Sequence, residues 1–273
     1  MPLLNTPDAL VDLARYSFDD IDLIDRSHRQ FVDDGVCVLP GFVPDDVVAR
    51  LVAEADALAP LAHRSRSRAT PYLAPPDESF PEGHPRRTVA HAAVEVVAYD
   101  QFPADSLLRS LYEWDALRDF IAAVLGQPVL HRYADPLGAL NLAIMRDGDV
   151  LGWHFDFTDF VVSIALQSST DGGHFLNAKQ LRTREHEAYG AVSDVLAQDE
   201  RSPRVRVEPM TPGTLMLFNG RNSLHQVSPI VGPLPRYVAL LSYDTKPGTD
   251  STDTLKLNRY GRLPVRAGGQ GAS

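Results

Sequence analysis

The sequence predicts a mainly β fold with flanking helices, of the α+β class, in which short strands form a barrel or double-sheet roll. From residue 129 onward, short apolar or alternating stretches are separated by turns rich in Gly, Pro and Asp. Before residue 126, helical patterns predominate. Many short strands with such turns are typical of barrels and sandwiches, and we expect the helices on one outer face of that core.

Helical patterns define the first half of the chain. Residues 18–34 begin with acidic side chains and carry apolar residues at helical spacing, and Gly35 ends the predicted helix. Residues 35–40 favour a short strand, and an acidic turn after a proline opens a second helix over 44–59. Residues 106–125 contain two more helical stretches.

Two other parts of the first half carry no single pattern. Residues 63–87 are rich in Arg, Ser and Pro without a clear period, so they are predicted to form a loop. A structureless connection of this length is uncommon inside a compact domain, which favours an active-site role. Residues 88–99 fit a helix and a strand equally.

The second half carries the strands. They are predicted at 129–133, 140–145, 150–156, 160–167, 173–178, 205–208, 214–219, 225–228 and 236–244. The polar residues 183–200 interrupt them and are expected to be helical. No repeat or long linker divides the chain, so the sequence predicts one domain over 1–273. Its parts are helical support with an entry strand (1–128), the roll (129–250) and a C-terminal extension (251–273).

Composition limits the class of partner. The chain has 273 residues, 44% of them hydrophobic, and a net charge of −10. It therefore has material for a buried core and lacks the basic face that nucleic-acid or anionic-membrane binding requires. The single cysteine, Cys37, lies in an apolar run and is expected to be buried in a reducing compartment. Because the sequence shows neither a signal peptide nor an apolar stretch of ~18 residues, we expect a cytoplasmic protein.

His154, Asp156 and His225 are the candidate metal ligands. Residues i and i+2 of a strand point to the same side, so His154 and Asp156 can converge on one ion while Phe155 points away. Two histidines and one carboxylate bind one face of a ferrous ion and leave the opposite face open for oxygen chemistry. Each residue alone is more simply a strand-end or turn residue, whereas the ordered set favours a metal site.

Arg236 lies in an otherwise apolar run that is typical of a buried strand. A buried guanidinium without a partner is strongly unfavourable, so Arg236 must meet a carboxylate. Its planar fork can grip a carboxylate in two places. The carboxylate belongs either to a bound ligand or to an internal Asp or Glu.

Three local strings carry a family resemblance: Gly152 through Phe157, Gly213 through His225, and Arg236 through Ser242. With them the chain resembles the iron(II)- and 2-oxoglutarate-dependent oxygenases. The resemblance implies a double-stranded β-helix core, a jelly roll of the cupin type, packed against the N-terminal helices. It also implies Fe(II) held by His154, Asp156 and His225, with 2-oxoglutarate and O2 as cosubstrates.

The resemblance assigns Arg236 to the distal carboxylate of 2-oxoglutarate. Many family members carry Ser or Thr two residues later, where this chain has Val238, so the second contact to the cosubstrate must come from elsewhere. Asn141 is a polar residue in an apolar strand. It is a candidate for that contact and equally for a structural hydrogen bond to the next strand.

The string Met145 through Asp149 and those around residues 152–167, 172–175, 213–227 and 241–248 resemble one bacterial branch, the carrier-free amino-acid halogenases and their hydroxylating relatives. This implies a small free amino acid or close derivative as substrate, in a biosynthetic pathway. Halogenating relatives replace the metal-binding carboxylate with Gly or Ala, which admits chloride. Because this chain keeps Asp156, hydroxylation is favoured, or oxidative desaturation or ring closure such as cyclopropane formation.

A free amino acid needs a cation for its carboxylate and an anion or carbonyl for its ammonium group. Arg86 and Arg87 are candidate cations in the long loop, and Asp159 is a candidate ammonium partner. A solvated basic loop and a turn aspartate are the plainer alternatives. The remaining candidates, expected to flank or shape the pocket, are His131, Trp153 and Ser242.

Two other function classes fit part of the pattern. A zinc-type hydrolase would use the same His-Asp-His set to activate water, but it gives Arg236 no role and offers no clear general base. A jelly roll that binds a small acid without catalysis would not need an intact ligand set. Oxygen-dependent succinate formation would separate an oxygenase from both.

Overall fold

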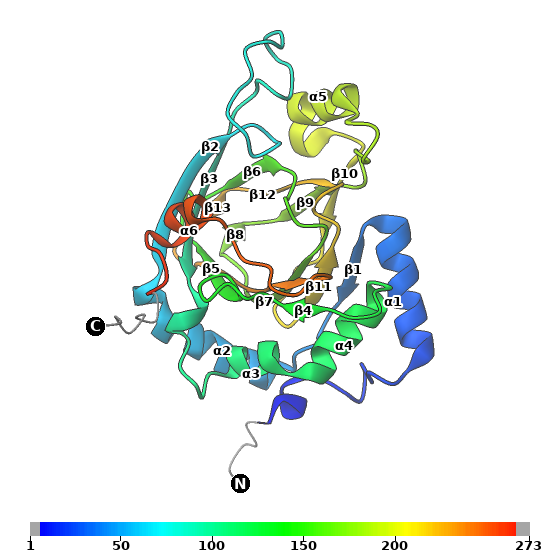
Figure 1. Ribbon diagram of the computed structural model, residues 1–273, viewed down its shortest axis with the longest axis vertical. Helices are drawn as coiled ribbons and strands as arrows, with labels where there is room; N and C mark the ends of the chain where they lie inside the picture. The colour runs from blue at the N-terminus through cyan, green and yellow to red at the C-terminus, as the bar shows by residue number, and fades with distance from the viewer. Residues whose placement is uncertain (1–5, 266–273) are drawn as a thin grey trace, which may run out of the picture.

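A curved antiparallel sheet, closed almost into a barrel, forms the centre of the computed structural model, which describes residues 6–265 (Figure 1). Its strands are β1 Val36–Leu39, β2 His63–Ala69, β3 Ala90–Val97, β5 Leu140–Met145, β6 Leu151–His154, β7 Val161–Gln167, β9 Phe175–Ala178, β10 Val205–Glu208, β11 Leu215–Phe218, β12 Leu224–Val227 and β14 Arg236–Leu241. They lie in the order β1-β11-β7-β14-β5-β3-β6-β12-β9-β10, with β2 beside β3. Two short ribbons are added: β4 (His131–Arg132) pairs with β15 (Tyr243–Asp244), and β8 (Asp171–Gly172) with β13 (Ile230–Val231).

The sheet folds over into two facing halves. The larger half carries β1, β11, β7, β14, β5 and β3, and the smaller carries β6, β12, β9 and β10. Within the described residues, the two halves are joined by one β3–β6 residue pair, Ala92 with Leu151. We call this junction the seam. The arrangement is the jelly roll that the sequence predicts, and the fold class is confirmed.

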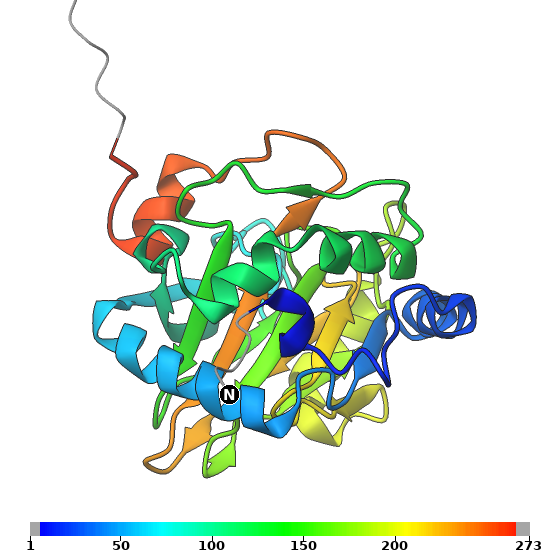
Figure 2. The same cartoon turned by 90° about the horizontal axis from the view of Figure 1, so that it is seen from below.

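Helices cover the outer face of the larger half (Figure 2). The helices are α1 Ile21–Asp34, α2 Asp45–Leu58, α3 Leu107–Glu113, α4 Asp115–Val124, α5 Tyr189–Gln198 and α6 Asp253–Tyr260, with short 3-10 turns at Pro7–Leu10, Ala59–Leu61, Tyr99–Gln101 and Asp199–Arg201. Leu51 of α2, Leu111 of α3 and Ile121 of α4 are fully buried against the sheet. None of the helices within residues 6–265 is long and apolar enough to cross a membrane.

Alternation along the strands separates this core from the barrel interior. In β5, Leu142 and Ile144 belong to the core under the helices, whereas Asn141 and Met145 line the interior cavity. The same alternation in β14 sends Arg236 inward. Successive side chains of a strand point to opposite faces, so a short apolar run carries both a core face and a functional face.

Local chemistry explains the helix boundaries that the sequence predicts. Asp20 caps α1 by accepting a hydrogen bond from the Leu23 backbone NH at 3.1 Å, and Gly35 ends the helix in the left-handed conformation at φ 68°. Ser106 caps α3 in the same way. Trp114 adopts an extended conformation between α3 and α4, which confirms the predicted division of residues 106–125.

Two predicted segments differ from the structure, and the structure resolves a third that the sequence left open. The predicted loop over residues 63–87 begins with strand β2, which pairs with β3 from His63 to Ala69. This strand lies at an edge and carries alternating Arg and Ser, so it lacks the apolar period that would reveal it. Within residues 88–99, which fit a helix or a strand equally, the structure has strand β3 over Ala90–Val97. The predicted strand 129–133 shrinks to the two residues of β4.

The C-terminal extension contains helix α6, for which the sequence pattern gave no expectation. Thr252 caps its start, Gly261 ends it at φ 69°, and the helix lies at one end of the barrel (Figure 1). Its Tyr260 hydroxyl donates to Asn141 Oδ1 on β5 at 2.9 Å. Residues 266–273, the remainder of the predicted extension, lie outside the described part of the chain.

Candidate active site

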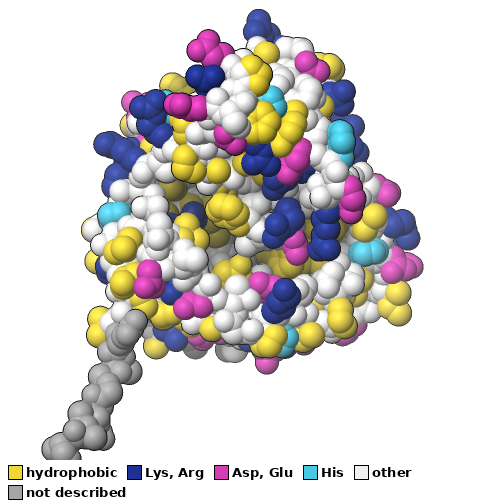
Figure 3. All heavy atoms as spheres, turned by 45° about the horizontal axis from the view of Figure 1, so that its top comes forward, with side chains coloured by type: hydrophobic (Ala, Val, Ile, Leu, Met, Phe, Trp, Pro, Cys, Tyr) yellow, Lys and Arg dark blue, Asp and Glu magenta, His cyan; other side chains and the backbone are white. Residues whose placement is uncertain are grey.

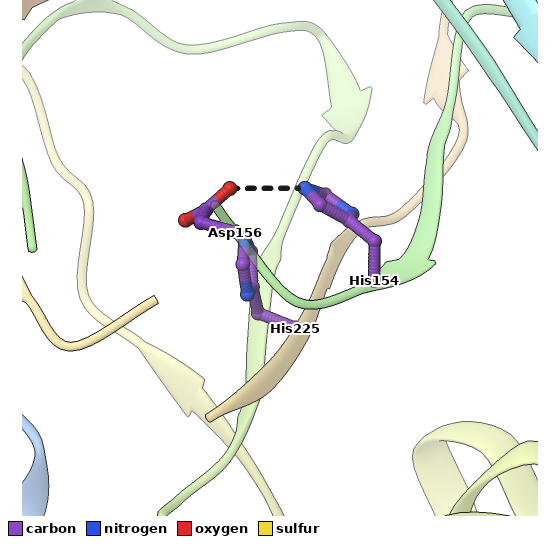
Figure 4. Close-up of side chains that lie close together, drawn as sticks. All are labelled: His154, Asp156 and His225. Carbon is purple, nitrogen blue, oxygen red and sulfur yellow. Dashed lines mark ion pairs between the residues drawn. The ribbon is translucent and has the colours of Figure 1, made fainter. Parts of the chain in front are cut away.

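His154, Asp156 and His225 converge at one end of the smaller half-sheet (Figure 4). His154 ends β6, Asp156 follows it, and His225 on β12 lies directly opposite His154 in the strand register. Asp156 Oδ1 is 3.7 Å from His154 Nε2, and Asp156 Oδ2 is 3.4 Å from His225 Nε2. One ligand atom from each residue lies within 4.8 Å of the others, which is the spacing that a shared metal ion needs.

Backbone carbonyls orient both imidazoles. His154 Nδ1 lies 2.7 Å from the Gly152 carbonyl oxygen, and His225 Nδ1 lies 3.0 Å from that of Ser223. When each Nδ1 donates its proton, each Nε2 presents a lone pair toward Asp156. Burial lowers the pKa of His225 to about 4, so this ring is neutral at physiological pH, as a metal ligand must be.

Gly220 leaves the space that the Asp156 carboxylate fills. The Asp156 backbone NH donates to the Gly220 carbonyl at 2.9 Å, and a Cβ atom at position 220 would overlap Asp156 Oδ2. On the other side, the Phe155 NH donates to the Pro71 carbonyl at 2.7 Å. The ligand-bearing turn after β6 is therefore held between two backbone segments, and any side chain at position 220 would displace the carboxylate.

A cavity of about 290 Å³ extends from the three ligands through the barrel. The face of the molecule shown in Figure 3 is hollowed, and hydrophobic side chains lie inside the hollow. The walls are mostly apolar, and its charged side chains within the described residues are Asp156, Arg236 and Arg259. Hydroxyl groups are supplied by Tyr133, Thr158, Ser163, Ser242, Tyr243, Ser251 and Tyr260.

Arg236 carries an unmatched charge in this cavity. Its side chain is 9% exposed, and no residue within 6–265 makes a hydrogen bond or ion pair with its guanidinium group. Burial lowers its pKa to about 10, which still leaves it positively charged at neutral pH. The internal ion pair that was the alternative for Arg236 is absent from the described part of the chain. A buried cation without an anion is the feature expected of a site for an anionic ligand.

These residues fit an iron ion and a dicarboxylate. The two Nε2 atoms and the Asp156 carboxylate are the donor set that ferrous iron takes in oxygenases, and half of its coordination positions would stay open. The open face and Arg236 border the same cavity. A ligand that chelates the metal at one end and carries a carboxylate at the other, as 2-oxoglutarate does, would satisfy both.

A family model for Halogenase D matches residues 19–258, most of the chain. The chain belongs to the Halogenase D family. This Halogenase D family protein is a 2-oxoglutarate-dependent non-haem iron oxygenase, with iron and 2-oxoglutarate as the cofactors typical of its family. A comparison with curated protein sequences found no match.

Three solved structures are similar in fold to this Halogenase D family protein. A 2OG-Fe(II) oxygenase family oxidoreductase from Burkholderia pseudomallei is 16% identical, aligns over 83% of this chain and 92% of its own, and has a TM-score of 0.51. The epimerase SnoN from nogalamycin biosynthesis, in complex with Fe3+, alpha ketoglutarate and nogalamycin RO, is 15% identical over 82% and 84%, with a TM-score of 0.56. HygX from Streptomyces hygroscopicus is 16% identical over 80% and 86%, with a TM-score of 0.51. At these identities the likeness shows the fold.

Asn141 and Ser242 line the cavity of the Halogenase D family protein, as the sequence predicts for contacts there. The Asn141 amide is already engaged, because its nitrogen donates to the carbonyls of Leu137 and Leu140 at 2.9 and 2.7 Å and its oxygen accepts from Tyr260. The structural hydrogen bond offered as its alternative is therefore present, although to a helix rather than to a strand. A contact from Asn141 to 2-oxoglutarate stays a prediction.

The loop arginines and Trp153 do not line the cavity. Arg86 donates to the Tyr189 hydroxyl at 2.7 Å and lies over the Tyr72 ring, which docks the β2–β3 loop on α5. Arg87 donates to the Phe80 carbonyl at 3.2 Å within its own loop. The Trp153 indole donates to Asp199 Oδ1 at 2.7 Å, in a separate apolar cluster. All three side chains are therefore engaged with other parts of the protein. A contact from any of them to the substrate stays a prediction.

His131 and Asp159 also do not line this cavity. His131 belongs to the short ribbon β4, where it pairs with Asp244. Asp159 forms an ion pair with Arg221 and borders a second, smaller cavity. As an ammonium partner, Asp159 would have to share its carboxylate with Arg221. A substrate contact from His131 stays a prediction.

The sequence missed two cavity residues. Ser163 on β7 is 2% exposed, and its hydroxyl has no hydrogen-bond partner in residues 6–265. Arg259 is in the last turn of α6. A serine among Val161, Val162 and Ile164 was a readable signal, since a polar residue in an apolar strand also singled out Asn141. Arg259 gave no such signal, because nothing local distinguishes it from a surface arginine.

Proposed function

We propose that this enzyme removes hydrogen from a carbon of a free amino acid or amino-acid-like metabolite in a biosynthetic pathway. The outcome is hydroxylation, or desaturation or ring closure such as cyclopropane formation. One observation carries the proposal: the unpaired, buried Arg236 shares a cavity with the His154, Asp156 and His225 ligand set. The cavity volume of about 290 Å³ supports a substrate of small-molecule size.

Four side chains of the cavity would bind the metal ion and orient the cosubstrate. His154, Asp156 and His225 would hold iron(II), and Arg236 would hold the distal carboxylate of 2-oxoglutarate. Together with dioxygen, the bound iron and 2-oxoglutarate supply the oxidising power that unactivated C–H bonds require. The apolar walls keep water away and hold the substrate carbon near the open face of the metal site, where a small misplacement changes which bond reacts.

Asp156 favours oxygenation over halogenation. Its two oxygens lie 3.7 and 3.4 Å from the two imidazole Nε2 atoms, so the carboxylate fills the third ligand position. A halide would need that position. We therefore infer that this member of the Halogenase D family does not itself transfer halide to its substrate.

A hydrolase that uses the same three ligands is less well supported. It would need a general base beside the metal, and Asp156 is the only acidic side chain among the described residues of the cavity lining. A binding protein without catalysis would account for Arg236, but it would not account for the two imidazoles and the carboxylate that are arranged to hold a metal ion. Neither alternative uses the whole site.

The test is succinate formation by anaerobically iron-loaded protein after addition of 2-oxoglutarate and oxygen, across a panel of free amino acids. We expect succinate to require oxygen and to rise with substrate, with a product that gains one oxygen atom or loses two hydrogen atoms. His225→Ala should abolish the signal. His186→Ala, a change at an exposed histidine outside the cavity, is the matched control. Conversion of a substrate without oxygen and without succinate formation would refute the proposed oxygenase activity.

A further inference from the structure

Helix α6 turns one face toward the active-site cavity. Leu255 and Arg259 are four residues apart, so they lie on the same side of the helix. Both line the cavity, together with Ser251 just before the helix. The C-terminal extension therefore supplies part of the cavity wall, and that wall contains a cation.

Two anchors fix the orientation of this helix. The Lys256 side chain is 3% exposed, and its Nζ lies 3.9 Å from Oδ1 of the fully buried Asp135. Tyr260 donates to Asn141 Oδ1 at 2.9 Å. Because these contacts hold the helix from residues on either side of Arg259, they direct Arg259 to the cavity.

Arg259 has no acidic partner within residues 6–265. Its neighbour in the cavity is the Tyr260 hydroxyl, which is neutral. The other cation, Arg236, lies at the opposite end of β14, because Asn141 pairs with Leu240 and Arg236 pairs with Met145. Four residues of strand separate these levels, about 13 Å. The two arginines therefore come from different levels of the barrel wall.

The charges of the cavity assign the two arginines to different ligands. The two carboxylates of 2-oxoglutarate and Asp156 would match the iron ion and Arg236. Arg259 is then the one charge among the described lining residues that is left unmatched. A partly buried cation in an apolar cavity gains most from a bidentate carboxylate.

We propose that Arg259 binds the carboxylate of the substrate, and that the substrate is a small acid with an aliphatic body and no cationic side chain. This rests on the proposed function. Apolar side chains such as Val238, Leu240 and Leu255 line the cavity beside the aliphatic body. A second positive charge would find no free acidic group, since Asp156 is a metal ligand. The unpartnered Ser163 hydroxyl is available to accept a hydrogen bond from an α-amino group.

The experiment compares acids with their neutral carboxamides. Anaerobic protein loaded with iron and 2-oxoglutarate is titrated with L-leucine, L-norleucine, the amide of each, and L-lysine. Binding is followed by the visible absorption of the iron–2-oxoglutarate complex, and succinate is measured after oxygen is admitted. We expect the two acids to bind and to stimulate succinate. The amides should need about 10- to 100-fold higher concentrations, because they lose a charged hydrogen bond to Arg259. L-lysine should also bind more weakly than the two acids, because its side-chain ammonium group finds no free acidic partner in the described cavity lining.

Variants of Arg259 test whether this side chain causes the preference for acids over amides. Arg259→Gln should remove the preference for acid over amide by weakening the acids, while Arg259→Lys keeps a reduced preference. Arg262→Gln is the control, because Arg262 pairs with Asp100 on the surface at the same end of α6 and outside the cavity lining. It should keep the full preference. A purely structural role for Arg259 would weaken acids and amides alike.

The outcomes separate this inference from the proposed function. Acids and amides that bind equally, a preference that survives in Arg259→Gln, or failure of both acids to bind would each overturn the role of Arg259. In all three cases iron and 2-oxoglutarate still bind and give slow, substrate-independent succinate. Failure of the wild-type protein to bind iron and 2-oxoglutarate, or to form any succinate, would instead overturn the proposed function.

Discussion

Replacing Arg236 with Met should stabilise the protein without ligands and abolish its response to 2-oxoglutarate. Burial lowers the pKa of Arg236 from 12.5 to about 10. A folded-state pKa below the unfolded value means that keeping the group charged in the folded protein costs free energy at any pH below both values. The difference corresponds to roughly 3 kcal/mol at neutral pH. Met fills a similar volume without a charge, so most of this cost should disappear.

The assay is thermal unfolding of the anaerobic iron-loaded protein with and without 2-oxoglutarate. For a chain of this size, about 3 kcal/mol corresponds to a rise in Tm of roughly 5 °C or more. Wild-type protein should gain Tm with 2-oxoglutarate, and Arg236→Met should start higher and gain nothing. Arg68→Met, on the exposed edge strand β2, is the control and should respond as wild type does. A variant that is less stable, or that still responds to 2-oxoglutarate, would refute the reasoning.

Three further substitutions test the site. Gly220→Ala should lower iron affinity about 10- to 100-fold with little change in fold, because the new Cβ displaces Asp156; iron titration followed by circular dichroism checks both. Asp156→Gly should abolish product formation, and unchanged activity in that variant would remove Asp156 from the ligand set. Ser163→Ala should raise the free energy of unfolding by about 1 kcal/mol, because it removes an unsatisfied buried hydroxyl. It should also weaken L-leucine binding several-fold, and denaturant unfolding with the titration above measures the two effects.

The metal site was predictable because its signal is local. His154 and Asp156 are two residues apart at a strand end, and Arg236 is a charge in an apolar strand, so each is conspicuous against its own neighbours. The alternation of β5 and β14 fixes which side chains face inward, and sequence carries that period directly. The helices before residue 126 were predictable for the same reason, since their caps and apolar spacing lie within the segments themselves.

The substrate contacts were not predictable because they depend on distant partners. Arg86 is a Pro-flanked arginine in a long loop, yet Tyr189, about a hundred residues away, holds it against α5. Arg259 faces the cavity because Asp135 and Asn141 hold α6 through its neighbours. Which way a surface helix or loop turns is decided by such contacts, and no local period records them. Strand β2 was missed likewise, since its pairing with β3 comes from backbone groups.

The seam between β3 and β6 has a consequence for how this barrel works. Strand β6 carries His154, yet it is joined to the larger half-sheet at one residue pair, whereas β5, β7 and β14 are braced by helices. Local opening is easiest where hydrogen bonds are fewest. An ion held by His154, Asp156 and His225 would join β6 to β12 inside the smaller half-sheet and would not cross the seam. Arg236 lies on β14 in the larger half-sheet, so the seam, rather than the metal site, sets how far the ligand set lies from this arginine.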